Sequence, residues 1–114
     1  MHKLAYVMQL KPDFKDSYVE IHRKHNVWQE IIDVNRRAGV SKEQIFVFGE
    51  YVFLYVEAED VEKMNRVYDQ DEGLRKWNKI TLNMMISKSK DPMDVITQLE
   101  HVYDYENGVL NDIE

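Results

Sequence analysis

The sequence predicts an α+β fold of the ferredoxin-like type, with the element order β-α-β-β-α-β, and three observations lead to it. The first and last regular stretches of the chain alternate large apolar residues with other residues, which is typical of strands. Two long stretches carry apolar residues at steps of three and four, which indicates helices. Two β-rich runs stand next to each other in the middle, as in a hairpin. In such a fold the helices pack on one face of a four-stranded antiparallel sheet.

The first half of the chain contains a strand and a long helix. Residues 4–10 alternate between two faces, and the polar, proline-containing stretch 11–13 ends this strand. Residues 14–38 contain no Gly or Pro, and their aromatic and apolar side chains recur with helical period. We therefore expect one continuous amphipathic helix over 14–38, which ends at Gly39.

A β-hairpin follows this helix. The runs 44–48 and 51–58 are rich in aromatic and β-branched residues, which favour strands. Gly49 and Glu50 separate them, and this is the length of a tight two-residue turn. The two runs are therefore predicted to pair as antiparallel neighbours.

The second half is predicted to contain another helical region and a last strand. Asp60 can cap the start of the helix, which we expect to break near Gly73 and then to resume. The polar stretch 87–92 is a loop. Residues 98–106 alternate as a final strand would, and residues 107–114 are expected to be a frayed C-terminal tail.

Size and charge narrow the class of protein. With 114 residues the chain fits one domain, which we place at residues 1–106, with 107–114 as the tail. Its net charge of −6 argues against nucleic acid or an anionic membrane surface as a partner. The chain has no cysteine, which excludes disulfide and thiolate chemistry. Since no stretch reads as a signal core or a membrane span, we expect a cytoplasmic protein.

Both faces of the predicted hairpin carry large apolar side chains. Phe46 and Phe48 share one face of the first strand, and Val52 and Leu54 lie on the opposite face of the second strand from Phe53. Helices can cover only one face of such a sheet. A second copy of the chain would cover the other face, so we expect a homodimer.

The predicted first helix places several groups suited to proton transfer on one side. Tyr18, His22, His25 and Trp28 follow one another at helical spacing. Histidine exchanges protons near neutral pH, and aromatic faces stack on the apolar side of sugar rings. A packing role is the ordinary alternative for each residue, above all for Trp28. His22 and His25 could also hold a metal, but no third ligand is evident, so no metal site is expected.

Six sequence blocks recur in a family-specific order. They are AYVMQLKPD at 5–13, Tyr18 with His22, HNVWQEI at 25–31, FLYVEAED at 53–60, LRKWNKIT at 74–81 and LEHVYDYE at 99–106. Together they resemble the L-rhamnose mutarotase family over the chain to about residue 106, which implies a dimeric α+β barrel. The resemblance also implies an isomerase that needs no cofactor and interconverts the α and β anomers of a free 6-deoxy sugar by acid–base catalysis through ring opening. L-Rhamnose is the expected sugar, and departures from the family pattern at the sugar site make L-fucose the alternative.

The family pattern also implies roles for particular residues. A Tyr four residues before a His marks the active site, and this pattern falls on Tyr18 and His22, the catalytic pair. A tryptophan of the later helix falls on Trp77, which would form a wall of the sugar site, with Asn78 where the family commonly has a second Trp. Trp28 and His25 would also contact the sugar, and His25 is the competing candidate for the acid–base role, because it lies closer to Trp28.

Two other functions stay open from the sequence. Ferredoxin-like dimers also host cofactor-independent monooxygenases and haem-degrading proteins, and a bound haem or quinone-like ligand would indicate that class. A non-catalytic module that binds a small ligand is the third interpretation. In that case His22→Ala would leave sugar binding intact and change no rate.

Overall fold

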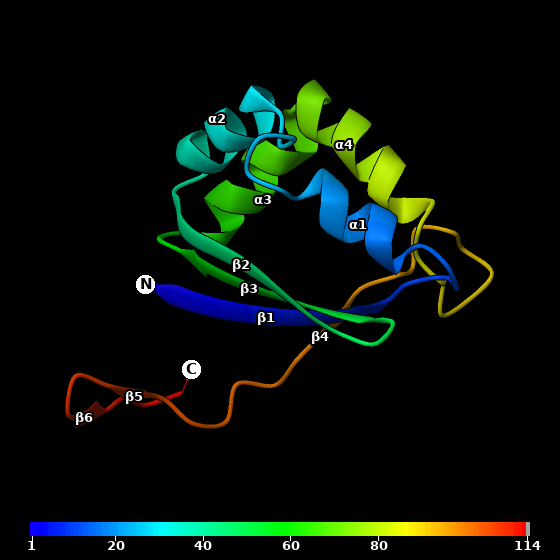
Figure 1. Ribbon diagram of the computed structural model, residues 1–114. Helices are drawn as coiled ribbons and strands as arrows, with labels where there is room; N and C mark the ends of the chain where they lie inside the picture. The colour runs from blue at the N-terminus through cyan, green and yellow to red at the C-terminus, as the bar shows by residue number, and fades with distance from the viewer. Residues whose placement is uncertain (114) are drawn as a thin grey trace.

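The computed structural model describes residues 1–113 and forms two layers. Within these residues a four-stranded sheet makes one layer, and four helices cover one of its faces (Figure 1). The strand order is β2-β3-β1-β4, and all neighbouring pairs are antiparallel. This order is the ferredoxin-like one, so the predicted fold is confirmed. Each helical segment of the simple β-α-β-β-α-β pattern is replaced by two helices.

Three long strands carry the sheet. They are β1 (His2–Gln9), β2 (Val40–Phe48) and β3 (Tyr51–Ala58). The predicted hairpin is confirmed, since Phe48 pairs with Tyr51 across the turn and Gly49 takes a φ of +59° there. Strand β2 begins at Val40, upstream of the predicted start at residue 44.

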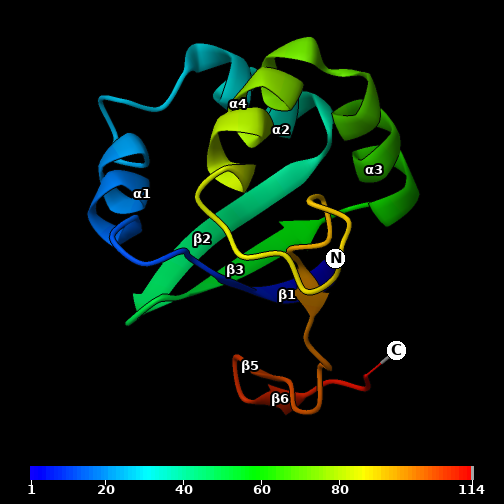
Figure 2. The same cartoon turned by 90° about the vertical axis from the view of Figure 1, so that its right-hand side faces the viewer.

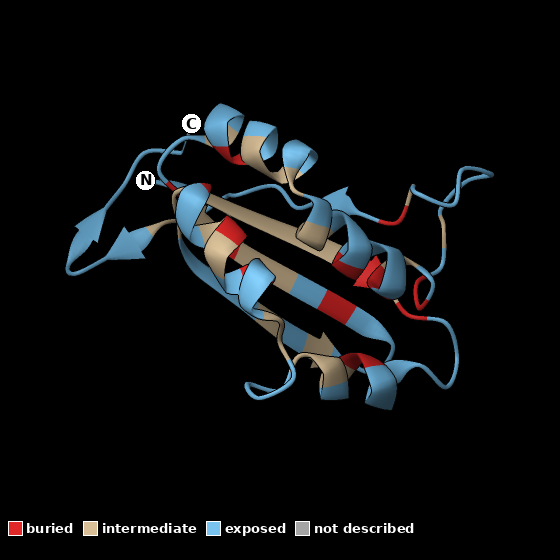
Figure 3. Cartoon of the chain, turned by 90° about the horizontal axis from the view of Figure 1, so that it is seen from above, coloured by how far each residue is buried: buried red, intermediate tan, exposed pale blue. Residues whose placement is uncertain are grey.

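The core lies between the sheet and the helices. Alternate residues of β1 and β3 point towards the helices, and their pairing places Met8 opposite Val52. Figure 3 shows buried positions on the sheet beneath the helices. The buried residues on this face of the sheet include Met8, Leu10, Val52, Val56 and Ala58.

The prediction of one helix over 14–38 is wrong. The chain forms α1 (Lys15–Ile21) and α2 (Gln29–Arg37), separated by an irregular segment that runs from His22 to Trp28. Local hydrogen bonds end α1. The side-chain amide of Asn26 donates to the carbonyl of Glu20 at 2.9 Å, where a continued helix would place a backbone N–H. Asparagine commonly competes with the helix in this way.

The second helical region also divides in two. Helix α3 (Val61–Gln70) begins at Asp60, whose side chain accepts a hydrogen bond from Lys63 N, so the predicted cap is confirmed. The break lies at Asp71 and not at Gly73, because the Asp71 side chain caps α4 (Glu72–Leu82) through the backbone N–H of Leu74 at 2.7 Å. None of the helices within residues 1–113 is long and apolar enough to span a bilayer.

The prediction of a final strand over 98–106 is wrong for most of its length. Strand β4 is only Thr97–Gln98, and the chain then leaves the sheet on the side opposite the helices (Figures 1 and 2). There β5 (Tyr105–Glu106) and β6 (Val109–Leu110) form a hairpin, so part of the expected tail is regular structure. The Asn-Gly turn at 107–108, with φ of +52° and +84°, explains this hairpin.

The face of the sheet opposite the helices is largely open. Phe46 and Phe48 are 60% and 78% exposed there. The C-terminal segment below this face is attached by an ion pair of 2.8 Å between Lys3 Nζ and Asp104 Oδ2. It also exposes apolar side chains, among them Val102 and Leu110.

We predict that Leu10→Ala destabilises the fold by about 2–5 kcal/mol, because Leu10 is fully buried where β1 leaves the sheet and its removal leaves a cavity. The measurement is the free energy of unfolding in urea. Leu110→Ala is the matched control, since Leu110 is 69% exposed and its truncation should change stability by about 0.5 kcal/mol or less. Equal losses in the two variants would contradict the assignment of Leu10 to the core.

Candidate active site

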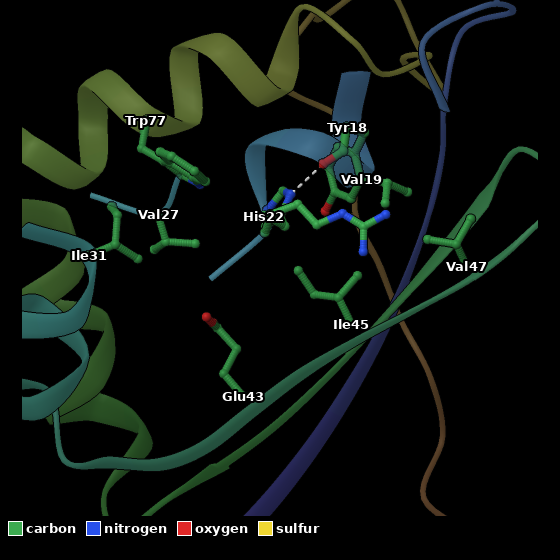
Figure 4. A pocket seen from close by; sticks show the side chains of 10 residues that line it. Tyr18, Val19, His22, Val27, Ile31, Glu43, Ile45, Val47 and Trp77 are labelled. Atoms are coloured by element: carbon green, nitrogen blue, oxygen red, sulfur yellow. Dashed lines mark hydrogen bonds between the residues drawn. The ribbon is translucent and has the colours of Figure 1, made fainter. Parts of the chain in front are cut away.

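A cavity of about 410 Å³ opens between the helices and edge strand β2 (Figure 4). Its volume falls in the range of roughly 300–1,000 Å³ that is usual for small-molecule sites. The wall combines apolar side chains with an imidazole, a phenol, an indole, a guanidinium and a carboxyl group. The lining residues are Tyr18, Val19, His22, Arg23, Val27, Ile31, Glu43, Ile45, Val47 and Trp77.

The end of α1 places His22 at this cavity and fixes its tautomer. His22 is the C-cap residue, and its backbone N–H bonds to Val19 O, which leaves the carbonyl of Tyr18 for the His22 side chain. Nδ1 lies 2.7 Å from that carbonyl oxygen. Since a carbonyl can only accept, Nδ1 carries the hydrogen. In the neutral ring, Nε2 is therefore the nitrogen that can take a proton.

Aromatic rings surround His22. Its ring centroid lies 4.4 Å from that of Tyr18 and 5.4 Å from that of Trp77, and it meets Trp77 edge-on at 88°. Trp28, the N-cap residue of α2, packs edge-on against Trp77 at 5.1 Å. Gly73 allows this contact, because a Cβ there would come within 2.8 Å of Glu30 Cβ and push α2 and α4 apart.

Burial sets the protonation of the imidazole and of the phenol. The pKa of His22 lies below its ordinary value of 6.5, because desolvation disfavours the imidazolium more than the bond to Tyr18 O favours it. Burial also raises the pKa of the Tyr18 hydroxyl strongly. At neutral pH the site thus holds a neutral imidazole that can accept a proton and a phenol that stays protonated.

Glu43 faces the cavity from β2, and the sequence analysis missed it. Glu43 lies on the same helix-facing side of the strand as Ile45 and Val47, so this side carries one charged residue among apolar ones. Its carboxyl is open to the cavity but poorly solvated, and this burial raises its pKa despite a hydrogen bond from Asn35. The signal was present in the alternation, but the predicted strand began one residue too late to include it.

The structure brings together only part of the predicted set. Tyr18, His22 and Trp77 line the cavity, and Trp28 packs against Trp77 without being one of the lining residues. His25 lies exposed in the segment between α1 and α2, because the helix that would have aligned it with His22 has ended.

Asn78 is exposed on α4, and its carbonyl accepts a hydrogen bond from the Thr81 hydroxyl. No three His, Asp or Glu residues of the described part, 1–113, gather as a set that could hold a metal ion.

The fold and the cavity by themselves define a class of protein. This is a ferredoxin-like α+β domain whose cavity offers acid–base groups between flat aromatic walls, an arrangement suited to proton transfer on a small polar ring compound. The family model for L-rhamnose mutarotase matches residues 3–105, and the chain belongs to that family, whose members are isomerases acting on carbohydrates. The comparison with curated proteins found no match.

The solved structures that resemble this one include two with different activities. An L-rhamnose mutarotase from Formosa agariphila is 24% identical, with a TM-score of 0.75 over 93% of this chain and 100% of its own. The tetracenomycin F2 cyclase of Streptomyces glaucescens, a type II polyketide cyclase, is 15% identical, with a TM-score of 0.62 over 93% of this chain and 98% of its own. At these identities the likeness shows the fold, which serves more than one chemistry.

We predict that the His22 imidazole titrates below pH 6.5, since burial lowers its pKa. The measurement is the pH dependence of its ring signals in two-dimensional NMR, assigned by loss of the signals in His22→Ala. Trp77→Ala should move the midpoint upwards, because removal of the indole admits water to the ring. A wild-type midpoint at or above 6.5 would contradict the described burial.

Proposed function

We propose that this protein interconverts the α and β anomers of L-rhamnose by opening and closing the sugar ring, with His22 as an acid–base group. The observation that carries the proposal is the placement of His22 at a cavity of sugar-binding size, with its tautomer set by Tyr18 O. The membership in the L-rhamnose mutarotase family supports the choice of reaction and of sugar.

The reaction needs only proton transfers. A base removes the proton of the anomeric hydroxyl while an acid protonates the ring oxygen, and the bond between C1 and the ring oxygen breaks to give an aldehyde. Rotation about the bond from C1 to C2 and closure on the other face yield the second anomer. His22 Nε2 can accept the hydroxyl proton, because the neutral imidazole predominates at neutral pH.

The surrounding aromatic groups hold the sugar in this proposal. The indole of Trp77 provides a flat apolar face for the C–H side of the ring, and Trp28 keeps the indole in place. The Tyr18 hydroxyl stays protonated and orients the sugar or the proton relay. His25 and Asn78 do not line the cavity, so the proposal gives them no contact with a monosaccharide.

The range of sugars and the cellular location also belong to the proposal. Asn78 stands where the family commonly has a second Trp, so a changed rim next to Trp77 would allow other 6-deoxy sugars, with L-fucose as the first to test. A cytoplasmic location stays a prediction, which fractionation of cells that express the protein would test.

We also propose a homodimer. The open face of the sheet exposes Phe46, Phe48 and Tyr51, and the C-terminal segment exposes further apolar side chains below it. Exposed apolar area on this scale favours association, and the C-terminal segment covers only part of this face within residues 1–113. A second copy that packs sheet against sheet would bury it.

Saturation-transfer NMR of the anomeric protons tests the reaction. Wild-type protein should speed the exchange between the α and β signals of L-rhamnose, and His22→Ala should lower the catalysed rate about 100-fold, as expected for loss of a general acid–base group. His25→Ala is the matched control and should keep the rate, because His25 is exposed outside the cavity.

Two results would decide against this proposal. If the wild type leaves the exchange of L-rhamnose and L-fucose at the spontaneous rate, the reaction is not the one proposed, and haem and quinols become the next ligands to screen. If His25→Ala and not His22→Ala abolishes catalysis, the acid–base group is misassigned.

The dimer is tested by sedimentation equilibrium at micromolar concentration. The wild type should have twice the chain mass of 13.7 kDa, and Phe48→Asp should shift it to the monomer, because a charge replaces an apolar group that is 78% exposed in the single chain. Ile32→Asp, on a helix away from the open face, is the control and should leave the dimer intact. A monomeric wild type would refute the proposal.

A further inference from the structure

Glu43 occupies the side of the cavity that faces His22. Its carboxyl rises from β2 towards the helix layer, while His22 and Trp77 reach into the same cavity from the helices (Figure 4). A sugar ring bound in the cavity would therefore lie between an imidazole on one side and a carboxyl on the other. Anomerisation needs a proton delivered to the ring oxygen and a proton removed from the anomeric hydroxyl. With one group on each side of the ring, each group can act on one of these two oxygens.

The carboxyl is held in place by a chain of hydrogen bonds. Asn35 Nδ2 donates to Glu43 Oε1 at 3.3 Å, and the Tyr68 hydroxyl donates to Asn35 Oδ1. The bond from Tyr68 fixes which end of the Asn35 amide faces Glu43. Because Asn35 donates to Oε1, we assign the proton of this carboxyl to Oε2.

We infer that Glu43 is the second acid–base group of the reaction, which protonates the ring oxygen while His22 takes the proton of the anomeric hydroxyl. This inference rests on the proposed mutarotase function and adds the partner that the single imidazole lacks. Glu43 lies outside the sequence blocks that resemble the L-rhamnose mutarotase family.

The proton balance closes over one turnover. Glu43 Oε2–H gives its proton to the ring oxygen, the bond from C1 to that oxygen breaks, and His22 Nε2 takes the proton of the anomeric hydroxyl as C1 becomes a carbonyl carbon. After rotation about the bond from C1 to C2, the imidazolium returns its proton to the carbonyl oxygen. The carboxylate takes the proton back from the attacking hydroxyl, so both groups regain their starting state.

The surroundings favour the two protonation states that this scheme needs. Burial raises the pKa of the Glu43 carboxyl and lowers the pKa of the His22 imidazole, so the first shift favours a protonated acid and the second a neutral base. The groups that face Glu43 from the packed elements are Tyr18 and His22 at α1, Arg23 after it, Asn35 on α2 and Tyr68 on α3.

The test is Glu43→Gln, which keeps the shape and an oxygen that accepts from Asn35 but cannot give a proton. Saturation transfer with L-rhamnose should show kcat lowered about 100-fold with KM little changed. In the wild type, kcat should fall as pH rises, because Glu43 loses its proton, and this alkaline limb should be absent from the residual rate of Glu43→Gln. The acidic limb from His22 should stay in both proteins.

Two further variants test whether the ionisable carboxyl at position 43 is the cause of the effect. Glu43→Asp retains an ionisable carboxyl and should restore part of kcat together with the alkaline limb. Glu50→Gln, in the turn of the same hairpin and outside the cavity, is the matched control and should behave as the wild type. The free energy of unfolding of each variant separates a loss of catalysis from a loss of fold.

Three outcomes would overturn the inference. They are an unchanged kcat in Glu43→Gln, a rise in KM alone, and an alkaline limb that persists in Glu43→Gln. Each of them leaves the mutarotase proposal intact as long as the wild type speeds exchange and His22→Ala does not. A wild type that fails to accelerate L-rhamnose exchange would instead reject the proposed function itself, and the role of Glu43 with it.

Discussion

The hydrogen bond between His22 Nδ1 and the carbonyl of Tyr18 links the end of a helix to the chemistry of the cavity. In a continued helix the backbone N–H of His22 would take that carbonyl. Here the imidazole takes it, α1 ends, and the chain turns away before α2 begins at Gln29. The same bond leaves Nε2 as the basic nitrogen, so the imidazole sets its own tautomer while it helps Asn26 to end the helix.

The layered fold makes both sides of the cavity. The helices bring an imidazole and an indole from above, and edge strand β2 brings a carboxyl from the sheet. Low solvation disfavours the charged form of both groups. It therefore lowers the pKa of the His22 imidazole and raises the pKa of the Glu43 carboxyl. The neutral base and the neutral acid are therefore both favoured, in a cavity that the charged Arg23 also lines. Gly73 contributes at a distance, since it lets α2 approach α4 closely enough for Trp28 to support Trp77.

The sequence predicted the sheet well and the helices less well. Alternation identified β1 and the β2–β3 hairpin because a strand buries every second residue, and this period is read directly from the chain. The helical period predicted one helix over residues 14–38, where the structure has two. It could not show the break, because the side-chain bond of Asn26 at the end of α1 leaves the apolar spacing unchanged. Alternation also predicted one strand over residues 98–106. The end of this stretch instead pairs across the Asn-Gly turn at 107–108 and forms a separate hairpin.

By itself the sequence determined the fold class, the pairing of Tyr18 with His22, and Trp77 as a candidate wall residue. The fold class and the shared side of Tyr18 and His22 follow from local spacing, whereas the resemblance to the L-rhamnose mutarotase family implied the role of Trp77. Only the tertiary structure decided that His25 lies outside the cavity, that Trp28 supports Trp77, and that Glu43 faces His22. The reason is physical: such contacts join residues from different elements, and their distances depend on where helices end and how closely the layers pack.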